Sequence, residues 1–314
     1  MTRELVVTSK EEAAEDVMVI HLTDPGGDPL PEWTPGAQVG VDGDGDVRQY
    51  SLCGPTSERF TWRIGVRRES NGVVSNKLHD SVSVGRRLHV SDPQNLFPLV
   101  PAERYVLIAG GIGITPLLPM VEEVKRAGRE WSLYYRGRSR GHMAFRSEVD
   151  GPGVTLWPED EHGLLPVNSL LGEPRPGTAV YCCGPAPLID AVTEACAAWP
   201  AGTLHVERFT PDRPGDSARP FVAELRRSKR TIDVPTDKSL LEAIEAAGIS
   251  VLSSCRTGTC GTCEATVLDG EPEHHDEVLT DEERQEGKLI MLCVSRFRSS
   301  DSIFDTRNTT KETP

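Results

Sequence analysis

The chain has 314 residues, of which 37% are hydrophobic and 26% charged, a length and composition typical of two or three globular domains. It carries 34 Lys and Arg against 48 Asp and Glu, a net charge of −14 that argues against binding to nucleic acid, because phosphate contacts need clustered basic residues. No apolar run reaches about 18 residues, so we expect no membrane insertion. The acidic N-terminal segment has no apolar region of a secretory signal, and we therefore expect a cytoplasmic protein.

The first hundred residues alternate short apolar segments with turns rich in Gly and Pro, such as DPGGDPLPEWTPG and DGDGD. Many short strands broken in this way predict an antiparallel barrel or sandwich. The expected strands cover residues 5–8, 17–22, 37–41, 48–52, 60–66 and 87–90.

One of these strands carries the motif Arg48-Gln49-Tyr50-Ser51. In a flavin site, Arg48 could pair with a phosphate, Tyr50 could lie along the flavin, and Ser51 could hydrogen-bond near its reactive edge. The alternative is an ordinary half-exposed strand with an outward-facing arginine.

Further along, Gly72 precedes a short predicted helix that opens near Val74 and Ser75. A glycine lets an anion approach closely, and the first N–H groups of a helix face such an anion. A simple turn before a helix would give the same pattern.

Beyond residue 101 the pattern changes to buried strands alternating with helices, which predicts a parallel sheet. The first strand runs into Gly110-Gly111-Ile112-Gly113-Ile114-Thr115-Pro116, with Thr115 as the expected N-cap and Pro116 at the first helical position. These glycines could admit a dinucleotide pyrophosphate, or they could serve the turn alone. Pro116 replaces the third glycine of the usual dinucleotide fingerprint.

Two further turns belong to the predicted nucleotide site. Arg136 and the basic residues after it follow the second strand, where an acidic ribose ligand is usual, and they could accept a 2′-phosphate. Another strand ends at Cys183 and Gly184, where Gly184 would allow the nicotinamide half to approach and Cys183 could contact it. A buried thiol before a turn is the alternative.

Residues 210–220 hold three prolines and several charges, and we expect an extended, semi-rigid linker. A third domain follows, with two strands, a helix within 238–248, and a cysteine-rich loop. The polar residues after Asp305 are expected to fray.

The eight cysteines divide into four scattered residues and one group. Cys255, Cys260, Cys263 and Cys293 follow the C-x4-C-x2-C…C spacing of a plant-type [2Fe–2S] cluster. Small residues fill the loop and allow backbone N–H groups to face the sulfurs. A structural zinc site fits the x4 gap poorly. The scattered cysteines are expected to be small buried hydrophobes.

The order of these motifs resembles the phthalate dioxygenase reductase family, in which vanillate O-demethylase reductases are close relatives. The resemblance covers nearly the whole chain. It implies a multidomain α+β and α/β architecture with an antiparallel β-barrel flavin domain at 1–101 and a parallel α/β NAD(P)H-binding domain at 102–209. A linker at 210–220 and a C-terminal β-grasp ferredoxin domain at 221–314 complete the implied order.

The resemblance also implies FMN, NADH and a [2Fe–2S] cluster as cofactors, with no acid–base catalytic residue. The implied flavin and nucleotide ligands are Arg48, Tyr50, Ser51, Gly72, Val73, Val74, Ser75, Gly111, Thr115, Arg136, Cys183, Gly184 and Phe209. The implied cluster ligands are Cys255, Cys260, Cys263 and Cys293. NADH is expected rather than NADPH, although the basic run from Arg136 departs from the family pattern.

A flavin can accept two electrons as hydride and release them singly, so the expected route runs from NADH through FMN and the cluster to an external acceptor. The family acceptor is a Rieske-type oxygenase, and the reductase itself is expected to be a monomer. Residues 264–286 hold ten acids and one base, either a solvated face or a docking face for that oxygenase. The alternatives are a reductase for a cytochrome P450 or other monooxygenase, and a non-enzymatic metal-binding carrier.

Overall fold

The computed structural model describes residues 2–43, 45–70, 72–209, 219–253, 255–276, 278–298 and 301–306. The chain divides into two compact units, with the boundary in the sequence between residues 209 and 210. Most of the expected linker and the polar tail after residue 306 lie outside the described residues. In the described part of the chain, no helix has the length and apolar character needed to cross a membrane.

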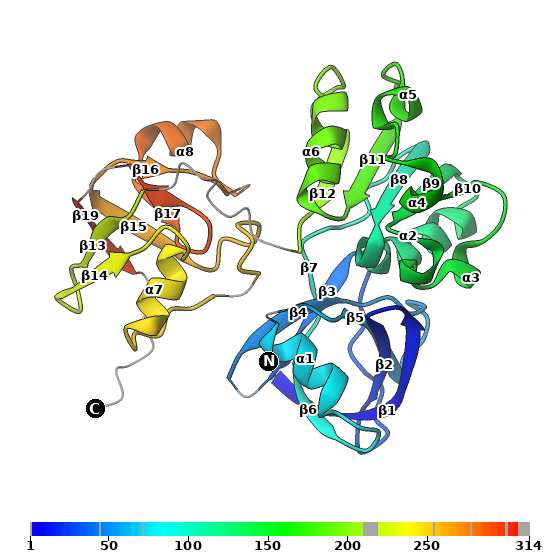
Figure 1. Ribbon diagram of the computed structural model, residues 1–314, viewed down its shortest axis with the longest axis horizontal. Helices are drawn as coiled ribbons and strands as arrows, with labels where there is room; N and C mark the ends of the chain where they lie inside the picture. The colour runs from blue at the N-terminus through cyan, green and yellow to red at the C-terminus, as the bar shows by residue number, and fades with distance from the viewer. Residues whose placement is uncertain are drawn as a thin grey trace. The chain divides into compact units, whose positions relative to one another are not determined.

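The first unit begins with an antiparallel sheet in the strand order β4-β3-β6-β1-β2-β5, with β7 beside β3 (Figure 1). The strands and the one helix of this part are β1 Thr2–Ala14, β2 Val17–Thr23, β3 Ala37–Asp42, β4 Val47–Ser51, β5 Thr61–Arg67, α1 Val73–Asp80, β6 Arg87–Ser91 and β7 Gln94–Asn95. A bridge between Leu52, just after β4, and Ile64 in the middle of β5 closes the barrel. The sequence predicts an antiparallel barrel, and the structure confirms it.

Alternating apolar residues of the strands fill the barrel, because successive side chains of a strand point to opposite faces. Helix α1 adds Val74 and Leu78 to this core. Lys10 of β1 donates to the carbonyls of His79 and Val82, both at 2.7 Å, and so fixes the end of α1 to the barrel.

The rest of the first unit is a parallel sheet in the order β10-β9-β8-β11-β12. Its strands are β8 Arg104–Gly110, β9 Glu130–Gly137, β10 Val154–Pro158, β11 Thr178–Cys183 and β12 Leu204–Glu207. Its helices are α2 Ile114–Arg126, α3 Arg146–Val149, α4 Glu159–His162, α5 Val167–Leu171 and α6 Ala186–Ala195, with short 3₁₀ turns at Gly111–Gly113 and Arg140–His142. The strand order reverses between β8 and β11, where ligands bind in open parallel sheets.

Two separate apolar cores cover the faces of the parallel sheet, one with α2 and the other with α5 and α6. The α2 core also includes Val17, Val19 and Cys53 from the outside of the barrel. A Cβ built on Gly65 of β5 would lie 2.8 Å from Cγ2 of Thr115, so glycine allows the two parts to pack closely. The α2 core is therefore shared by the parallel sheet and the outside of the barrel.

The second unit is a mixed sheet in the order β14-β13-β19-β15-β17, with a separate pair β16-β18. Its elements are β13 Phe221–Leu225, β14 Arg230–Val234, α7 Leu240–Ala246, β15 Glu264–Asp269, β16 Pro272–Glu273, α8 Asp281–Glu286, β17 Leu289–Met291, β18 Arg296–Phe297 and β19 Asp301–Thr306. Ser239 and Glu242 form a capping box that starts α7. The apolar face of α7 packs on the sheet, which is the β-grasp arrangement that the resemblance implies.

Candidate functional site

The predicted flavin motif lies on β4. Arg48 and Tyr50 are two residues apart and share one face of the strand, whereas Ser51 points to the other face. Arg48 is exposed, with a hydrogen bond from its guanidinium to the Val47 carbonyl at 3.0 Å. Tyr50 is half-buried against the barrel core, and burial raises the pKa of its phenol. One face of β4 therefore offers a cation and an aromatic ring to a ligand.

The predicted phosphate loop leads directly into α1. Gly72 is the N-cap, and a Cβ on it would lie 2.2 Å from Oγ of Ser75. No side chain caps this helix, and its first turn has no acidic residue, so its first N–H groups can face an anion. Val73 is 59% exposed at this end, whereas Val74 and Ser75 are buried.

The glycine loop after β8 and the turn after β11 touch at the point where the strand order reverses. A Cβ on Gly113 would lie 2.2 Å from the carbonyl oxygen of Cys183, and a Cβ on Gly184 would lie 3.0 Å from Cα of Gly110. Only glycine allows these backbones to approach so closely. Gly111 has a φ of +55°, and a Cβ there would point into open space. The described atoms thus leave room above Gly111 for a ligand.

The prediction that Thr115 caps α2 is wrong. The 3₁₀ turn at Gly111–Gly113 tightens the chain, so the helix starts at Ile114 with Gly113 as its N-cap. Thr115 lies inside the first turn, where its hydroxyl donates to the Ile112 carbonyl at 2.9 Å. Its role in the structure is to fasten the glycine loop and to pack against the barrel.

Three strand ends bring Ser51, Cys183 and Glu207 together. The Cys183 thiol is 3.7 Å from Oε2 of Glu207, and both side chains are buried. Burial raises the pKa of Glu207 to about 8, opposed mainly by the hydrogen bond from Cys183. Burial and the Glu207 carboxyl raise the pKa of Cys183. This point therefore holds a carboxyl group that is mostly protonated at neutral pH.

Glu207 is not among the site residues predicted from the sequence. The available signal was an acidic residue at the end of a predicted buried strand, LHVERF, where an apolar residue is usual. Phe209 follows two residues later and is 37% exposed. An exposed phenyl ring beside this cluster can cover a flat ligand.

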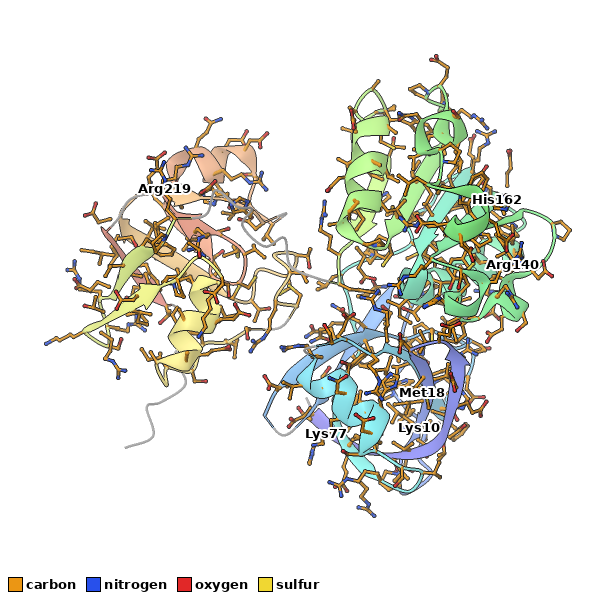
Figure 2. All side chains as sticks on the ribbon, viewed as in Figure 1. Lys10, Met18, Lys77, Arg140, His162 and Arg219 are labelled. Carbon is orange, nitrogen blue, oxygen red and sulfur yellow. The ribbon has the colours of Figure 1, made fainter. Side chains whose placement is uncertain are left out.

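Two of the three arginines at the end of β9 and just after it pair with acidic residues, whereas Arg138 is exposed and contacts His142. Arg136 pairs with Glu159 at 2.7 Å, and the two side chains are only 16% and 21% exposed. Arg140 pairs with Glu161, also at 2.7 Å. Both carboxylates belong to α4, whose last residue, His162, is labelled together with Arg140 in Figure 2. A phosphate at this edge would meet carboxylates as well as guanidinium groups.

The four grouped cysteines come together as two pairs. Cys255, Cys260 and Cys263 lie between α7 and β15, and Cys293 lies in the turn after β17. The Cys255 thiol interacts with that of Cys260, and the Cys263 thiol with that of Cys293. In each pair the hydrogen bond from the partner lowers one pKa, that of Cys255 and of Cys263.

Among the described residues, His, Cys, Asp and Glu side chains form no group of three or more suited to a single metal ion. Two pairs of thiols suit two irons instead, with two ligands each. Backbone N–H groups point at the sulfurs, from Thr257 to Cys255 at 3.4 Å and from Thr262 to Cys260 at 3.5 Å. These residues therefore fit a [2Fe–2S] cluster.

The four scattered cysteines are free and buried, as the sequence predicts. Burial raises the pKa of Cys53 and of Cys182, each to about 12, so both behave as apolar side chains.

A barrel with an open anion site, a parallel sheet with a glycine-lined switch point, and a β-grasp unit with paired thiols define a class of proteins. That class comprises flavin-dependent pyridine-nucleotide reductases that carry a plant-type ferredoxin domain. Residues 223–298 match the family model described as a 2Fe-2S iron-sulfur cluster binding domain.

Comparisons over nearly the whole chain identify the family. Phthalate dioxygenase reductase of Burkholderia cepacia is 38% identical over an alignment of 317 positions, which covers 96% of each chain. A solved phthalate dioxygenase reductase, described as a modular structure for electron transfer from pyridine nucleotides to [2Fe-2S], superposes with a TM-score of 0.77 at 38% identity over 97% of this chain and 98% of its own. The chain therefore belongs to the phthalate dioxygenase reductase family.

A third match is to part of a larger protein. An intact type IV self-sufficient cytochrome P450 monooxygenase matches with a TM-score of 0.75 and 40% identity, over 96% of this chain and 41% of its own. The chain is thus an oxidoreductase, an electron-transfer reductase of oxygenase systems with a [2Fe–2S] ferredoxin domain.

Proposed function

We propose that this chain passes electrons from NADH through FMN and a [2Fe–2S] cluster to a separate Rieske-type oxygenase. Residues 1–101 would bind FMN, 102–209 NADH and 221–314 the cluster, with 210–220 as linker. The observation that carries the proposal is the meeting of the β4, β11 and β12 ends in one buried cluster, with paired cysteine thiols in the second unit. When bound, the flavin supplies the conversion of a two-electron donor into single electrons.

The proposed flavin residues form two groups, one at the phosphate of FMN and one at its ring system. Arg48 and the N-terminus of α1, with Gly72, Val73, Val74 and Ser75, would hold the single phosphate by charge and by N–H donation. Tyr50 and Phe209 would cover the ring system, and Ser51 would hydrogen-bond to its edge. One helix N-terminus beside one arginine is suited to the compact phosphate of FMN.

The nucleotide would cross the switch point over Gly111, with its nicotinamide near Cys183 and Gly184. The pairing of Arg136 with Glu159 supports NADH, because a 2′-phosphate would have to break a largely buried ion pair and then face Glu159. Arg140 is occupied in the same way by Glu161. These acidic partners, which are distant from the arginines in the sequence, favour NADH.

The residues at the switch point would position reactants and exclude water. Thr115 fastens the glycine loop, and the contact of Gly113 with Cys183 fixes the separation between the two turns. The Glu207 carboxyl, with its pKa raised to about 8, holds a proton beside the Ser51 hydroxyl and the Cys183 thiol. A neutral buried group leaves the site without a fixed negative charge that would resist arriving electrons.

Cys255 and Cys260 would bind one iron and Cys263 and Cys293 the other. The neighbouring N–H groups would then stabilise the negative charge that a reduced cluster gains.

The partner proposal rests on the family and on surface charge. Asp281, Glu282 and Glu283 are exposed on α8, whereas Arg284, the one base of residues 264–286, is held by the Asp276 carbonyl. A face with this charge favours a partner with a basic docking surface. The match to a self-sufficient P450 supports the second candidate, a reductase for a cytochrome P450.

Two measurements test the proposal. Acid extraction of the purified protein should release FMN, and recovery of FAD would overturn the flavin assignment. The purified protein should also be reconstituted with a Rieske oxygenase and, separately, with a P450. NADH-dependent substrate turnover is expected with the Rieske oxygenase. Turnover with the P450 alone would transfer the assignment to the second candidate.

A further inference from the structure

A buried carboxylate in the second unit contacts both chain segments that carry the cluster cysteines. Asp276 lies between β16 and α8, and its side chain is fully shielded from solvent. Its Oδ2 accepts the backbone N–H groups of Val278 at 3.2 Å and Leu279 at 2.9 Å. Its Oδ1 accepts the hydroxyl of Ser295 at 3.1 Å.

The Ser295 contact leads to Cys293. Ser295 is two residues beyond this ligand, and its N–H donates to the Met291 carbonyl at 3.0 Å, which closes the turn that carries Cys293. The Ser295 oxygen also accepts the N–H of His275 at 3.2 Å. The hydrogen bond to Asp276 therefore ties the turn of the fourth ligand to the segment before α8.

The backbone of Asp276 contacts the loop of the first three ligands. A Cβ on Gly258 would lie 3.1 Å from Cα of Asp276 and 2.7 Å from Cγ2 of Val294, at a φ of +79°. Val294, which lies against Gly258, directly follows the ligand Cys293 in the chain. The ligand loop therefore touches the Cys293 turn at Gly258, and Asp276 packs against this point of contact.

We infer that Asp276 is a positioning residue for the [2Fe–2S] cluster. It sets the separation of the ligand loop from the Cys293 turn and keeps a carboxylate near them, with His274 at 3.6 Å and Arg284 at 4.0 Å as its basic neighbours. The inference rests on the proposed cysteine ligands. Asp276 donates nothing to iron; it acts through Ser295 and through the packing of Gly258. Cluster potentials respond to local charge and to hydrogen bonds at the sulfurs, so both parts of this role are measurable.

The test compares Asp276→Asn, Ser295→Ala and the control Asp233→Asn in the full-length protein. Asp233 is an exposed carboxylate of β14 in the same unit, and its replacement makes the same change of charge. The readouts are the reduction potential of the cluster, the g-values of its EPR signal after dithionite, and the rate of cluster loss to a chelator.

Asp276→Asn should move the potential in the positive direction, change the g-values and accelerate cluster loss several-fold. Ser295→Ala should change the g-values and the loss rate with a smaller change of potential, and Asp233→Asn should match the parent. Parent-like values in Asp276→Asn would overturn the inference, as would parent-like g-values in Ser295→Ala. If Asp276→Asn retains no cluster, the g-values of Ser295→Ala decide alone: changed values support the inference, and parent-like values overturn it. A parent protein without cluster absorbance would instead refute the proposed ligands.

Discussion

Replacing Glu207 with Gln tests the buried carboxyl at the meeting of the strand ends. Burial raises the pKa of Glu207 from 4.5 to about 8, so the folded first unit favours the neutral form. A raised folded pKa contributes stability that is fully present below pH 4.5 and lost as the pH rises towards 8. At about 1.4 kcal/mol per pH unit, the loss is on the order of 5 kcal/mol above pH 8 and about 3 kcal/mol at pH 7.

Gln is neutral at every pH and has nearly the same shape, so Glu207→Gln should gain stability over the parent as pH rises. The expected gain grows by about 1.4 kcal/mol per pH unit between pH 5.5 and 7.5. Urea unfolding at saturating FMN, followed by tryptophan fluorescence, measures it, because all five tryptophans lie in residues 1–209. Glu194→Gln, an exposed change on α6, is the control and should show no trend with pH.

The rate of flavin reduction by NADH gives a second readout for the same variant. The parent rate should change around pH 8 as Glu207 ionises, and the variant rate should stay flat there. A stability difference between variant and parent that does not vary with pH would refute the placement of a protonated carboxyl at this site.

Three further predictions follow from the described contacts. Glu159→Gln frees Arg136, so the ratio of kcat/KM for NADPH over NADH should rise roughly tenfold, an effect on the order of 1.4 kcal/mol; an unchanged ratio would contradict the placement of the ribose at this edge. Gly113→Ala puts a Cβ 2.2 Å from the Cys183 carbonyl, so thermal melting should show about 1–3 kcal/mol of destabilisation and NADH should reduce the flavin far more slowly, whereas Gly26→Ala, beside a flexible Asp24 side chain, should match the parent. Raising the ionic strength should slow electron transfer to the oxygenase several-fold without slowing flavin reduction, and a rate that does not respond to salt would remove the docking role of α8.

Local patterns predict much of the fold. The barrel, the parallel sheet and the β-grasp unit follow from strand periodicity, turn residues and the resemblance, because those features act over a few residues. The four cysteines come from spacing alone. Their division into two pairs, Cys255 with Cys260 and Cys263 with Cys293, needs the folded loop.

The remaining features depend on contacts between distant segments. Glu207 becomes notable only when β12 brings it to Cys183, and the partner of Arg136 lies on α4, beyond another strand. The start of α2 differs from the predicted N-cap at Thr115 because a 3₁₀ turn at Gly111–Gly113 precedes the helix. This turn goes with the close contact of Gly113 with Cys183, which local sequence preferences do not reveal. Within the acidic stretch 264–286, Asp276 is buried, whereas Asp281, Glu282 and Glu283 on α8 are exposed.

An anaerobic titration of the purified protein with NADH tests the central claim most directly, with flavin absorbance and cluster EPR recorded at each addition. FMN takes two electrons and the cluster one, so complete reduction should require about one and a half NADH per chain. The proposed route predicts flavin bleaching together with the EPR signal of a reduced [2Fe–2S] cluster. A flavin that bleaches while the cluster stays oxidised, or a titration that ends at one NADH, would contradict it.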